Sequence, residues 1–270
     1  MSSENASPAR TETSLIVSAK KTEGDSPTPL GMTKRLFATL IVYRNDDPSR
    51  SGAMNMAIDE ALLETARAPL IRFYRWNHPA LSFGYFGKFS DVEVFASERD
   101  LVRRWTGGGI VFHGDDLTYS IVVPASDRVF SASSASIYEN IHRAIRAALI
   151  EAGHCAELAP AAAVCGRRQQ MNSAIIDRRY SADACFANPI RADVLLNGQK
   201  IAGAAQRRTR VGLLQQGSIQ AVDLADDFKL RFAQELSLKI HEGQIDNGIV
   251  QRAKQISLNK YRTEPWLRRR

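Results

Sequence analysis

Two segments of the 270-residue chain combine glycine with charged side chains in a way that could act on a carbonyl or phosphoryl group. The first is Arg103-Arg104-Trp105-Thr106-Gly107-Gly108-Gly109, which leads into a short apolar run ending at His113. Three consecutive glycines are poor strand formers, so they indicate close approach of the backbone to something bulky or anionic. Their amides could cradle a phosphate or a developing oxyanion. The spacing is neither a Walker loop nor a dinucleotide fingerprint, and a bulged strand beside a packed helix remains an alternative.

The second segment surrounds Lys200. Small residues flank this lysine, Gly198 before it and Ala202-Gly203-Ala204-Ala205 after it, and they leave space for a ligand beside the strand. A lysine in such a slot can direct its ammonium at a carbonyl or phosphate oxygen, or lower the pKa of a neighbouring thiol. A lysine after a hairpin turn is more often a solvated edge residue, so the residues alone leave both interpretations open.

Cysteine and histidine positions argue against a metal site. The three cysteines, Cys155, Cys165 and Cys185, are an odd number with no Cys-x-x-Cys spacing, which disfavours a disulfide framework and a structural zinc site. The five histidines show no ligand spacing. We therefore expect no metal and a reducing cytoplasmic environment, and the residues alone make Cys185 a small buried hydrophobe.

Composition predicts a globular protein with a basic surface. Of the residues, 44% are hydrophobic and 24% charged, and no apolar run is long enough for a bilayer span or a secretory signal. The net charge of +7, from 36 basic and 29 acidic residues, suggests an acidic partner, either a protein or a nucleic acid. Zinc-finger spacing and aromatic RNA-binding motifs are missing from the sequence, which argues against nucleic acid as the main partner.

Hydrophobic patterning predicts one domain between two tails. Residues 1–35 are polar and lack apolar periodicity, so we expect a disordered tail. Residues 36–260 form the predicted domain, and residues 261–270 a basic tail. The expected strands cover 36–43, 70–76, 110–113, 117–124 and 212–222, with a hairpin over 192–208 that turns at Asn197-Gly198. Helices are expected over 53–67, 92–100, 223–240 and 247–261.

The clearest expected helix covers residues 131–153. Its apolar stripe includes Ile137, Ile141 and Ile145, with Ser136 as the predicted N-cap and Gly153 as the stop. Hairpins mixed with helices, without regular strand–helix alternation, predict an α+β fold with a mixed, largely antiparallel sheet and surrounding helices.

Four segments in the same order resemble the lipoate-protein ligase and octanoyltransferase family. They lie between about residues 36 and 222: Met54-Asn55-Met56-Ala57-Ile58-Asp59-Glu60-Ala61, Arg104-x-Thr106-Gly107-Gly108-Gly109-x-x-x-His113 with Leu117-Thr118-Tyr119-Ser120, Lys200-Ile201-Ala202-Gly203-x-Ala205-Gln206-Arg207, and Leu214-Gln215-x-Gly217-Ser218-Ile219. The resemblance implies the catalytic-domain fold of the biotin and lipoate protein ligases, with an acyl-binding tunnel. It implies that Lys200 contacts the acyl carbonyl and that the tunnel is formed by Arg104, Thr106, Gly107, Gly108, Gly109, His113, Gly203, Ala205 and Gln206.

The family contains two chemistries, and Cys185 decides which of them this chain resembles. ATP-dependent ligases activate free lipoate as an adenylate and need no nucleophilic side chain. Octanoyltransferases take octanoyl from acyl carrier protein, and the segment Asp183-Ala184-Cys185-Phe186 is similar to the one that carries the nucleophile in their cysteine-dependent members. The resemblance thus implies catalytic roles for Cys185 and Lys200. An acyl thioester is already activated, so thiolate attack followed by resolution on an acceptor lysine is chemically sensible.

Two departures from the family pattern leave room for another acyl group or acceptor. The transferases have an acidic residue directly after the strand-ending histidine, whereas this chain has Gly114-Asp115-Asp116. Ala187-Asn188-Pro189 follows Cys185 where Asp-Ala-Pro-Ser is more usual.

We therefore predict a cytoplasmic acyltransferase of protein lipoylation. It moves octanoyl, or lipoyl, from acyl carrier protein to a lysine of a lipoyl-accepting protein, such as the glycine cleavage H protein or a 2-oxoacid dehydrogenase E2. This activity needs no cofactor and no membrane. The alternative is an ATP-dependent lipoate-protein ligase, which requires ATP and Mg²⁺. A non-catalytic acyl or nucleic-acid binder that kept the fold is a third possibility.

Overall fold

An eight-stranded mixed sheet forms the centre of the computed structural model, which describes residues 35–43, 50–160 and 189–269. Its strand order is β11-β1-β2-β6-β10-β9-β8-β7. β1 runs parallel to β11 and β2, and the remaining neighbours are antiparallel. The strands are β1 (Leu40–Tyr43), β2 (Leu70–Tyr74), β6 (Leu117–Pro124), β7 (Ala156–Leu158), β8 (Val194–Leu196), β9 (Gln199–Arg208), β10 (Gly212–Ile219) and β11 (Ile240–Glu242).

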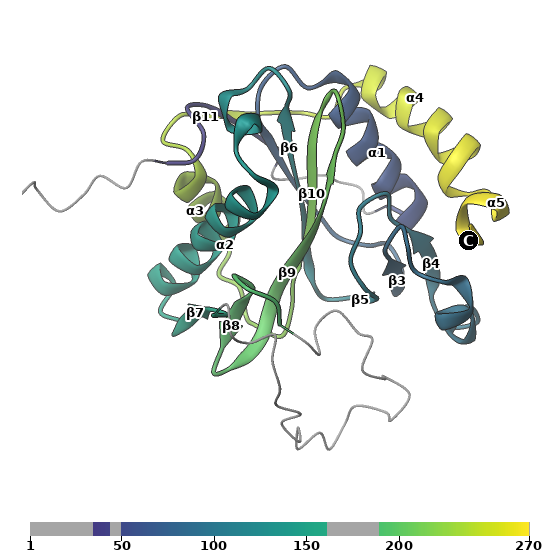
Figure 1. Ribbon diagram of the computed structural model, residues 1–270, viewed down its shortest axis with the longest axis horizontal. Coiled ribbons are helices and arrows are strands. Elements are labelled where there is room, and N and C mark those ends of the chain that lie inside the picture. Colours follow the sequence, from purple (N-terminus) through teal and green to yellow (C-terminus); the bar gives the residue numbers. More distant parts are fainter. Residues whose placement is uncertain (1–34, 44–49, 161–188, 270) are drawn as a thin grey trace, which may run out of the picture. The chain divides into compact units, whose positions relative to one another are not determined.

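Helices cover both faces of this sheet (Figure 1). α2 (Ser134–Glu151) and α3 (Phe228–Leu236) pack on one face, where Ile141 and Phe232 meet Tyr119 and Ile121 of β6. α1 (Gly52–Thr65) and α4 (Asn247–Ile256) pack on the other, where Ile58 meets Val122. Adjacent residues of a strand point to opposite faces, so β6 contributes to both cores. This explains why all eight residues of β6 are buried. The α+β prediction is confirmed.

A second, three-stranded sheet has the order β4-β3-β5. It consists of β3 (Ala80–Phe83), β4 (Asp100–Arg103) and β5 (Val111–His113). The helix predicted over 92–100 is wrong: two 3₁₀ turns, η1 (Phe89–Asp91) and η2 (Glu93–Phe95), precede β4. Val92 is buried but Val94 is 68% exposed, so this segment has no continuous apolar face that a helix could bury.

The sequence correctly predicts the hairpin turn at Asn197-Gly198 and the end of α2 at Gly153, but it predicts the wrong N-cap for α2. Asn197 and Gly198 both have positive φ, 52° and 75°, as a two-residue type I′ hairpin requires. Gly153 has φ 91° and follows α2, as predicted. The N-cap of α2 is Ser133 and not Ser136, because the Ser133 side chain accepts a hydrogen bond from the Ser136 amide at the third helical position.

The residues predicted as a basic tail after position 260 belong to the folded unit that begins at Arg35. A π-helical turn, η5 (Ser257–Tyr261), leads into α5 (Glu264–Leu267). The buried Arg103 guanidinium donates to the carbonyls of Trp266, Leu267 and Arg269, and the Trp266 indole donates back to the Arg103 carbonyl. These bonds satisfy helix-end carbonyls that α5 leaves open, and they hold the chain end on β4.

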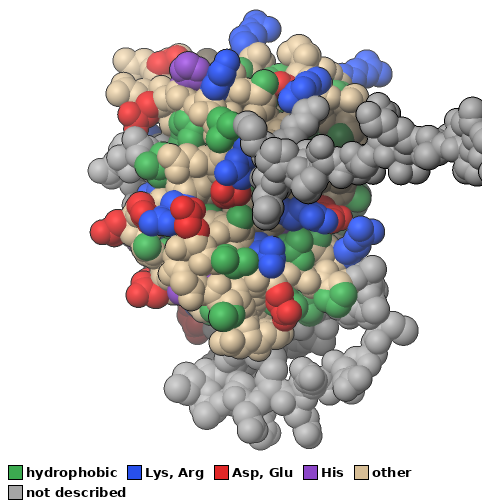
Figure 2. All heavy atoms as spheres, turned by 90° about the vertical axis from the view of Figure 1, so that its left-hand side faces the viewer, with side chains coloured by type: hydrophobic (Ala, Val, Ile, Leu, Met, Phe, Trp, Pro, Cys, Tyr) green, Lys and Arg blue, Asp and Glu red, His purple; other side chains and the backbone are tan. Residues whose placement is uncertain are grey.

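Charged side chains are mixed on the face of the molecule that lies to the left in Figure 1. Figure 2 shows this face, where the basic and acidic side chains of the described residues are interspersed with hydrophobic ones. No helix within the described ranges is long and apolar enough to cross a membrane.

Candidate active site

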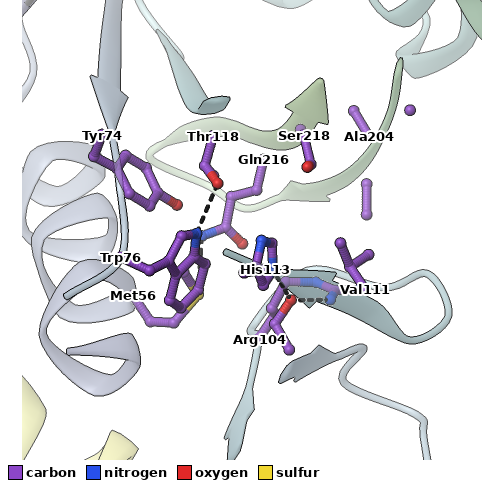
Figure 3. A pocket seen from close by; sticks show the side chains of 14 residues that line it. Met56, Tyr74, Trp76, Arg104, Val111, His113, Thr118, Ala204, Gln216 and Ser218 are labelled. Atoms are coloured by element: carbon purple, nitrogen blue, oxygen red, sulfur yellow. Dashed lines mark hydrogen bonds between the residues drawn. The ribbon is translucent and has the colours of Figure 1, made fainter. Parts of the chain in front are cut away.

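A pocket lies where the three-stranded sheet faces strands β6, β9 and β10 (Figure 3). It contains about 410 Å³ of empty space, including the part that opens to solvent. Its lining combines apolar and aromatic groups with a few polar ones: Met56, Tyr74, Trp76, Ser82, Arg104, Val111, His113, Thr118, Gly203, Ala204, Ala205, Gln216, Gly217 and Ser218.

Small residues of β9 and β10 keep this pocket open. Gly203, Ala204 and Ala205 line it, which agrees with the space that the sequence predicts beside Lys200. A Cβ atom on Gly203 would lie 2.6 Å from Cε of Lys200, so the lysine stem runs directly against this glycine. A Cβ atom on Gly217 would lie 2.3 Å from the Tyr119 ring. Glycine is therefore required at both positions by contacts within the fold.

Lys200 is buried and not a solvated edge residue. Its Nζ lies 2.8 Å from Oδ2 of Asp193, and both side chains are almost inaccessible, at 3% and 0% exposure. Asp193 also accepts hydrogen bonds from the Tyr138 hydroxyl and the Ile190 amide. Its position depends on the preceding residue, Ala192, which adopts a left-handed conformation with φ 68°. The ammonium thus lies behind Gly203, held against a carboxylate with several donors.

Two uncharged side chains, Tyr138 and His142, lie close to Asp193. Burial lowers the pKa of His142 to about 4, and its ring centroid lies 4.1 Å from that of Tyr138. Neutral His142 donates from Nδ1 to the Ala192 carbonyl and accepts from the Tyr119 hydroxyl. Burial and the Asp193 charge raise the pKa of Tyr138, so its hydroxyl remains a donor to Asp193. Sequence patterns gave no signal for Asp193, because its partner groups come from α2 and β9.

His113 forms the second polar centre of the pocket. Its Nδ1 lies 2.8 Å from Oδ2 of Asp116, and the Trp76 ring stacks on the imidazole at 4.0 Å. The acidic partner of His113 is therefore Asp116, three residues after it and not directly after it. Burial raises the pKa of Asp116, but bonds from His113, Ser218 and Gly114 outweigh it and the pKa is lowered. Burial also lowers the pKa of His113, and Asp116 opposes this only in part.

Arg104 connects this centre to the glycine run. Its Nη1 donates to Oγ of Ser82 at 2.7 Å, while Nη2 donates to the carbonyls of Gly107 and Gly109 at 3.1 and 2.8 Å. Gly108, between them, has φ 86° and lies against Ala205 of the pocket wall. The guanidinium therefore fixes the shape of the glycine run through its carbonyls.

A buried network around Asp59 supports the pocket floor. Asp59 pairs with Arg72 at 2.8 Å, with no exposure of either side chain, and accepts from Ser120 and Gln216. Gln216 in turn accepts from Thr106 at 2.8 Å. The helix segment from Met54 to Ala61 thus contributes Met56 to the pocket and a carboxylate that orients two strands.

Four of the residues predicted to bind substrate line the pocket: Arg104, His113, Gly203 and Ala205. The other predicted residues do not line it: Thr106, Gly107, Gly108, Gly109, Lys200 and Gln206, and Gln206 instead lines a separate pocket beside α2. Gln206 donates to the Gln215 side chain across the β9–β10 pair. Cys185 lies outside the described residues. Ser82 and Trp76 were missed as site residues, because their contacts to His113 join elements distant in sequence. Asp116 was missed although it lies only three residues after His113.

The close approach that the three glycines predict involves the protein's own backbone. A Cβ atom on Gly84, just after β3, would lie 2.0 Å from the Gly108 carbonyl oxygen. We expect Gly84→Ala to lower the free energy of unfolding by about 1–3 kcal/mol, because the glycine run must move away. Gly107→Ala is the matched control, since a Cβ atom there meets nothing within 4 Å. Denaturant unfolding of both variants tests this, and equal losses would refute the assigned contact.

Among the described residues, no group of three His, Cys, Asp or Glu side chains is arranged to hold a metal ion.

Comparison with known proteins gives both sequence and structural matches. Residues 51–255 match the family model of the lipoyl protein ligase A/B catalytic domain. The chain is 37% identical over 186 residues to octanoyltransferase LipM of Oceanobacillus iheyensis, which covers 64% of this chain and 62% of that protein. It is 32% identical over 223 residues to octanoyltransferase LipM of Brevibacillus brevis, which covers 80% of this chain and 77% of that protein. The match therefore spans less than two thirds of the Oceanobacillus protein.

Solved structures share the fold at low sequence identity. Lipoate-protein ligase A bound with ATP superimposes with a TM-score of 0.62 at 21% identity, covering 86% of this chain and 98% of that one. The bipartite lipoate protein ligase from Thermoplasma acidophilum, solved in a study with its E2 lipoyl domain, gives a TM-score of 0.60 at 20% identity, covering 86% and 96%. Both confirm the predicted fold.

Proposed function

The chain belongs to the lipoyl protein ligase A/B catalytic-domain family, and from this premise we propose that it is an acyltransferase. It transfers an octanoyl or lipoyl group from acyl carrier protein to a lysine of a lipoyl-accepting protein. The observation that carries the proposal is its 32% identity to an octanoyltransferase across 80% of the chain. The pocket supports it, because a largely apolar cavity with a buried ammonium behind one wall suits an acyl chain that ends in a carbonyl.

We propose Cys185 as the nucleophile of this reaction. Its thiolate attacks the carbonyl carbon of the donor thioester, the carrier thiol leaves, and the acyl group remains on sulfur. The amine of the acceptor lysine then attacks, an amide forms and the Cys185 thiol is released. Cys185 precedes Ile190 by five residues, and a chain of that length spans up to about 18 Å. Because the Ile190 amide and the Lys200 ammonium contact the same Asp193 carboxylate, the chain is long enough for the thiol to reach Lys200.

In this proposal Lys200 stabilises the negative charge that develops on the acyl oxygen or on the thiol sulfur. Its ammonium is held within a fold that excludes water, where one positive charge has a larger effect than at the surface. Arg104, His113, Gly203 and Ala205 contact the acyl group in this proposal. In the same proposal, the backbone of Gly107, Gly108 and Gly109, together with Thr106 and Gln206, supports the shape of the acyl site or the oxyanion.

The partners proposed are octanoyl acyl carrier protein and a lipoyl-domain protein, the glycine cleavage H protein or a 2-oxoacid dehydrogenase E2. The net charge of +7 favours encounter with acidic partners through long-range attraction. The donor is already a thioester, so the reaction requires neither ATP nor another cofactor.

Intact-protein mass spectrometry tests the proposal directly. The purified protein is mixed with octanoyl acyl carrier protein, without ATP and without acceptor. A mass gain of one octanoyl group that hydroxylamine removes is the expected result. No adduct, but acceptor modification once free lipoate, ATP and Mg²⁺ are added, identifies a ligase instead. No turnover under either condition, with DNA binding that falls steeply with salt, identifies a binding protein.

A further inference from the structure

The hydrogen bonds around Asp116 fix the proton positions on His113. Oδ2 of Asp116 accepts from the hydroxyls of Thr118 and Ser218 at 2.9 and 2.6 Å, and Oδ1 accepts from the Gly114 amide at 3.1 Å. The lowered pKa of this carboxyl keeps it ionised. An ionised carboxylate can only accept hydrogen bonds, so Nδ1 of His113, which lies 2.8 Å from Oδ2, must carry a proton and donate it. In the neutral imidazole, Nε2 is consequently a proton acceptor.

Ser82 connects this acceptor to the pocket. Its Oγ lies 2.7 Å from Nε2 of His113 and 2.7 Å from Nη1 of Arg104. A guanidinium can only donate, so Ser82 accepts from Arg104 and directs its own proton to His113. A hydroxyl has two acceptor positions, and within the described part of the chain only Arg104 donates to Ser82. Because Ser82 lines the pocket, its second acceptor position is available to a reacting group there.

We propose that Ser82, His113 and Asp116 form a proton relay for the amide-forming step, a role that rests on the acyl transfer proposed above. As the acceptor amine attacks the thioester carbonyl, an N–H bond breaks and its proton passes to Oγ of Ser82. The Ser82 proton passes at the same time to Nε2 of His113. When the carbon–sulfur bond breaks, the proton returns by the same path to the leaving thiolate. The products are an amide and a thiol, and His113 is neutral again.

The surroundings of His113 favour its action as a base. Trp76 covers one ring face, and the charged groups that face the imidazole are Asp116, Arg104 and Arg99. Burial lowers the pKa of His113, Asp116 opposes this, and the two arginines add to the lowering. The imidazole is therefore neutral and able to accept a proton at pH 7, and it loses this capacity as the pH falls through a value below 6.5.

The pH dependence of single-turnover transfer to a lipoyl-domain lysine tests the relay. In the wild type, a plot of the logarithm of the rate against pH should have a slope of about 2 below the His113 pKa, because both His113 and the attacking amine must be unprotonated. Above the His113 pKa only the amine still titrates, and the slope should be about 1. Ser82→Ala should show a slope of about 1 throughout and transfer about 10²-fold slower at pH 7. Ser82→Thr, which keeps the hydroxyl, should restore the change of slope.

Ser218→Ala is the matched comparison, because it also removes a hydroxyl that lines the pocket. The Ser218 hydroxyl donates to Asp116, whereas the hydroxyl that contacts Nε2 of His113 is that of Ser82. Ser218→Ala should keep the change of slope whatever its effect on the rate. A change of slope that persists in Ser82→Ala overturns the relay. If Ser82→Ala does not fold, the wild type decides: a proton inventory in mixed H₂O and D₂O that is linear, with one proton in flight, also overturns it. Absence of transfer by the wild type contradicts the proposed function instead.

Discussion

Cys185→Ala should prevent formation of the octanoyl adduct and slow transfer to the acceptor by at least about 10³-fold. The reason is that the proposed reaction passes through a covalent thioester, and alanine offers no atom on which it can form. Direct attack by the acceptor amine on the carrier thioester then remains, and it requires both partner proteins to be bound at the same time. Intact-protein mass spectrometry measures the adduct, and a gel-shift or mass assay of the acceptor measures transfer.

The other two cysteines provide the control for this prediction. A Cys155→Ala/Cys165→Ala double variant keeps Cys185 as its single thiol, and Cys155 is exposed and distant in sequence from the site motifs. This variant should form the hydroxylamine-sensitive adduct as the wild type does. An adduct in Cys185→Ala that is lost in the double variant would assign the nucleophile to another cysteine.

Sequence patterns predicted the elements of the fold better than their pairing. The hairpin at Asn197-Gly198 was predictable because both positions require φ above zero, which that dipeptide tolerates. The parallel pairing of β1 with β11 was not, because Leu40 and Ile240 are 200 residues apart and each strand is short. The chain end was also misjudged: arginine content predicted a basic tail outside the domain, whereas Arg103 binds the carbonyls there.

In the candidate site, too, some residues could be predicted from local sequence and others could not. Gly203 and Ala205 could be assigned to a pocket wall from local composition, since small residues remove bulk wherever the strand lies. Asp193 could not be assigned, because it acquires its role from Tyr138 and Lys200 on other elements. The shift of the acidic residue after His113 is compensated by a turn that returns Asp116 to Nδ1.

Substitutions of Lys200 and of Asp193 should affect the stability of the fold and the rate of transfer to different extents. Asp193→Ala leaves a buried ammonium without its carboxylate, so we expect the free energy of unfolding to fall by about 3–5 kcal/mol. Lys200→Met leaves Asp193 with the Tyr138 and Ile190 donors and should cost less, about 1–3 kcal/mol. Transfer should nevertheless fall by at least about 10²-fold in Lys200→Met, because the charge beside the carbonyl is lost. Denaturant unfolding and single-turnover transfer measure the two effects.

An exposed ion pair of Arg191, two residues before Asp193, is the control for these changes in stability and transfer. Arg191 pairs with Glu139 at 3.1 Å and is 68% exposed, so Arg191→Ala should change the free energy of unfolding by less than about 1 kcal/mol and leave transfer unaltered. If Lys200→Met transfers as fast as Arg191→Ala, the lysine serves the fold alone. If instead Lys200→Met is the less stable of the two pair variants, the Tyr138 and Ile190 donors do not hold Asp193 without the ammonium. A loss of transfer without a matching loss of stability places the Lys200 charge in the reaction itself.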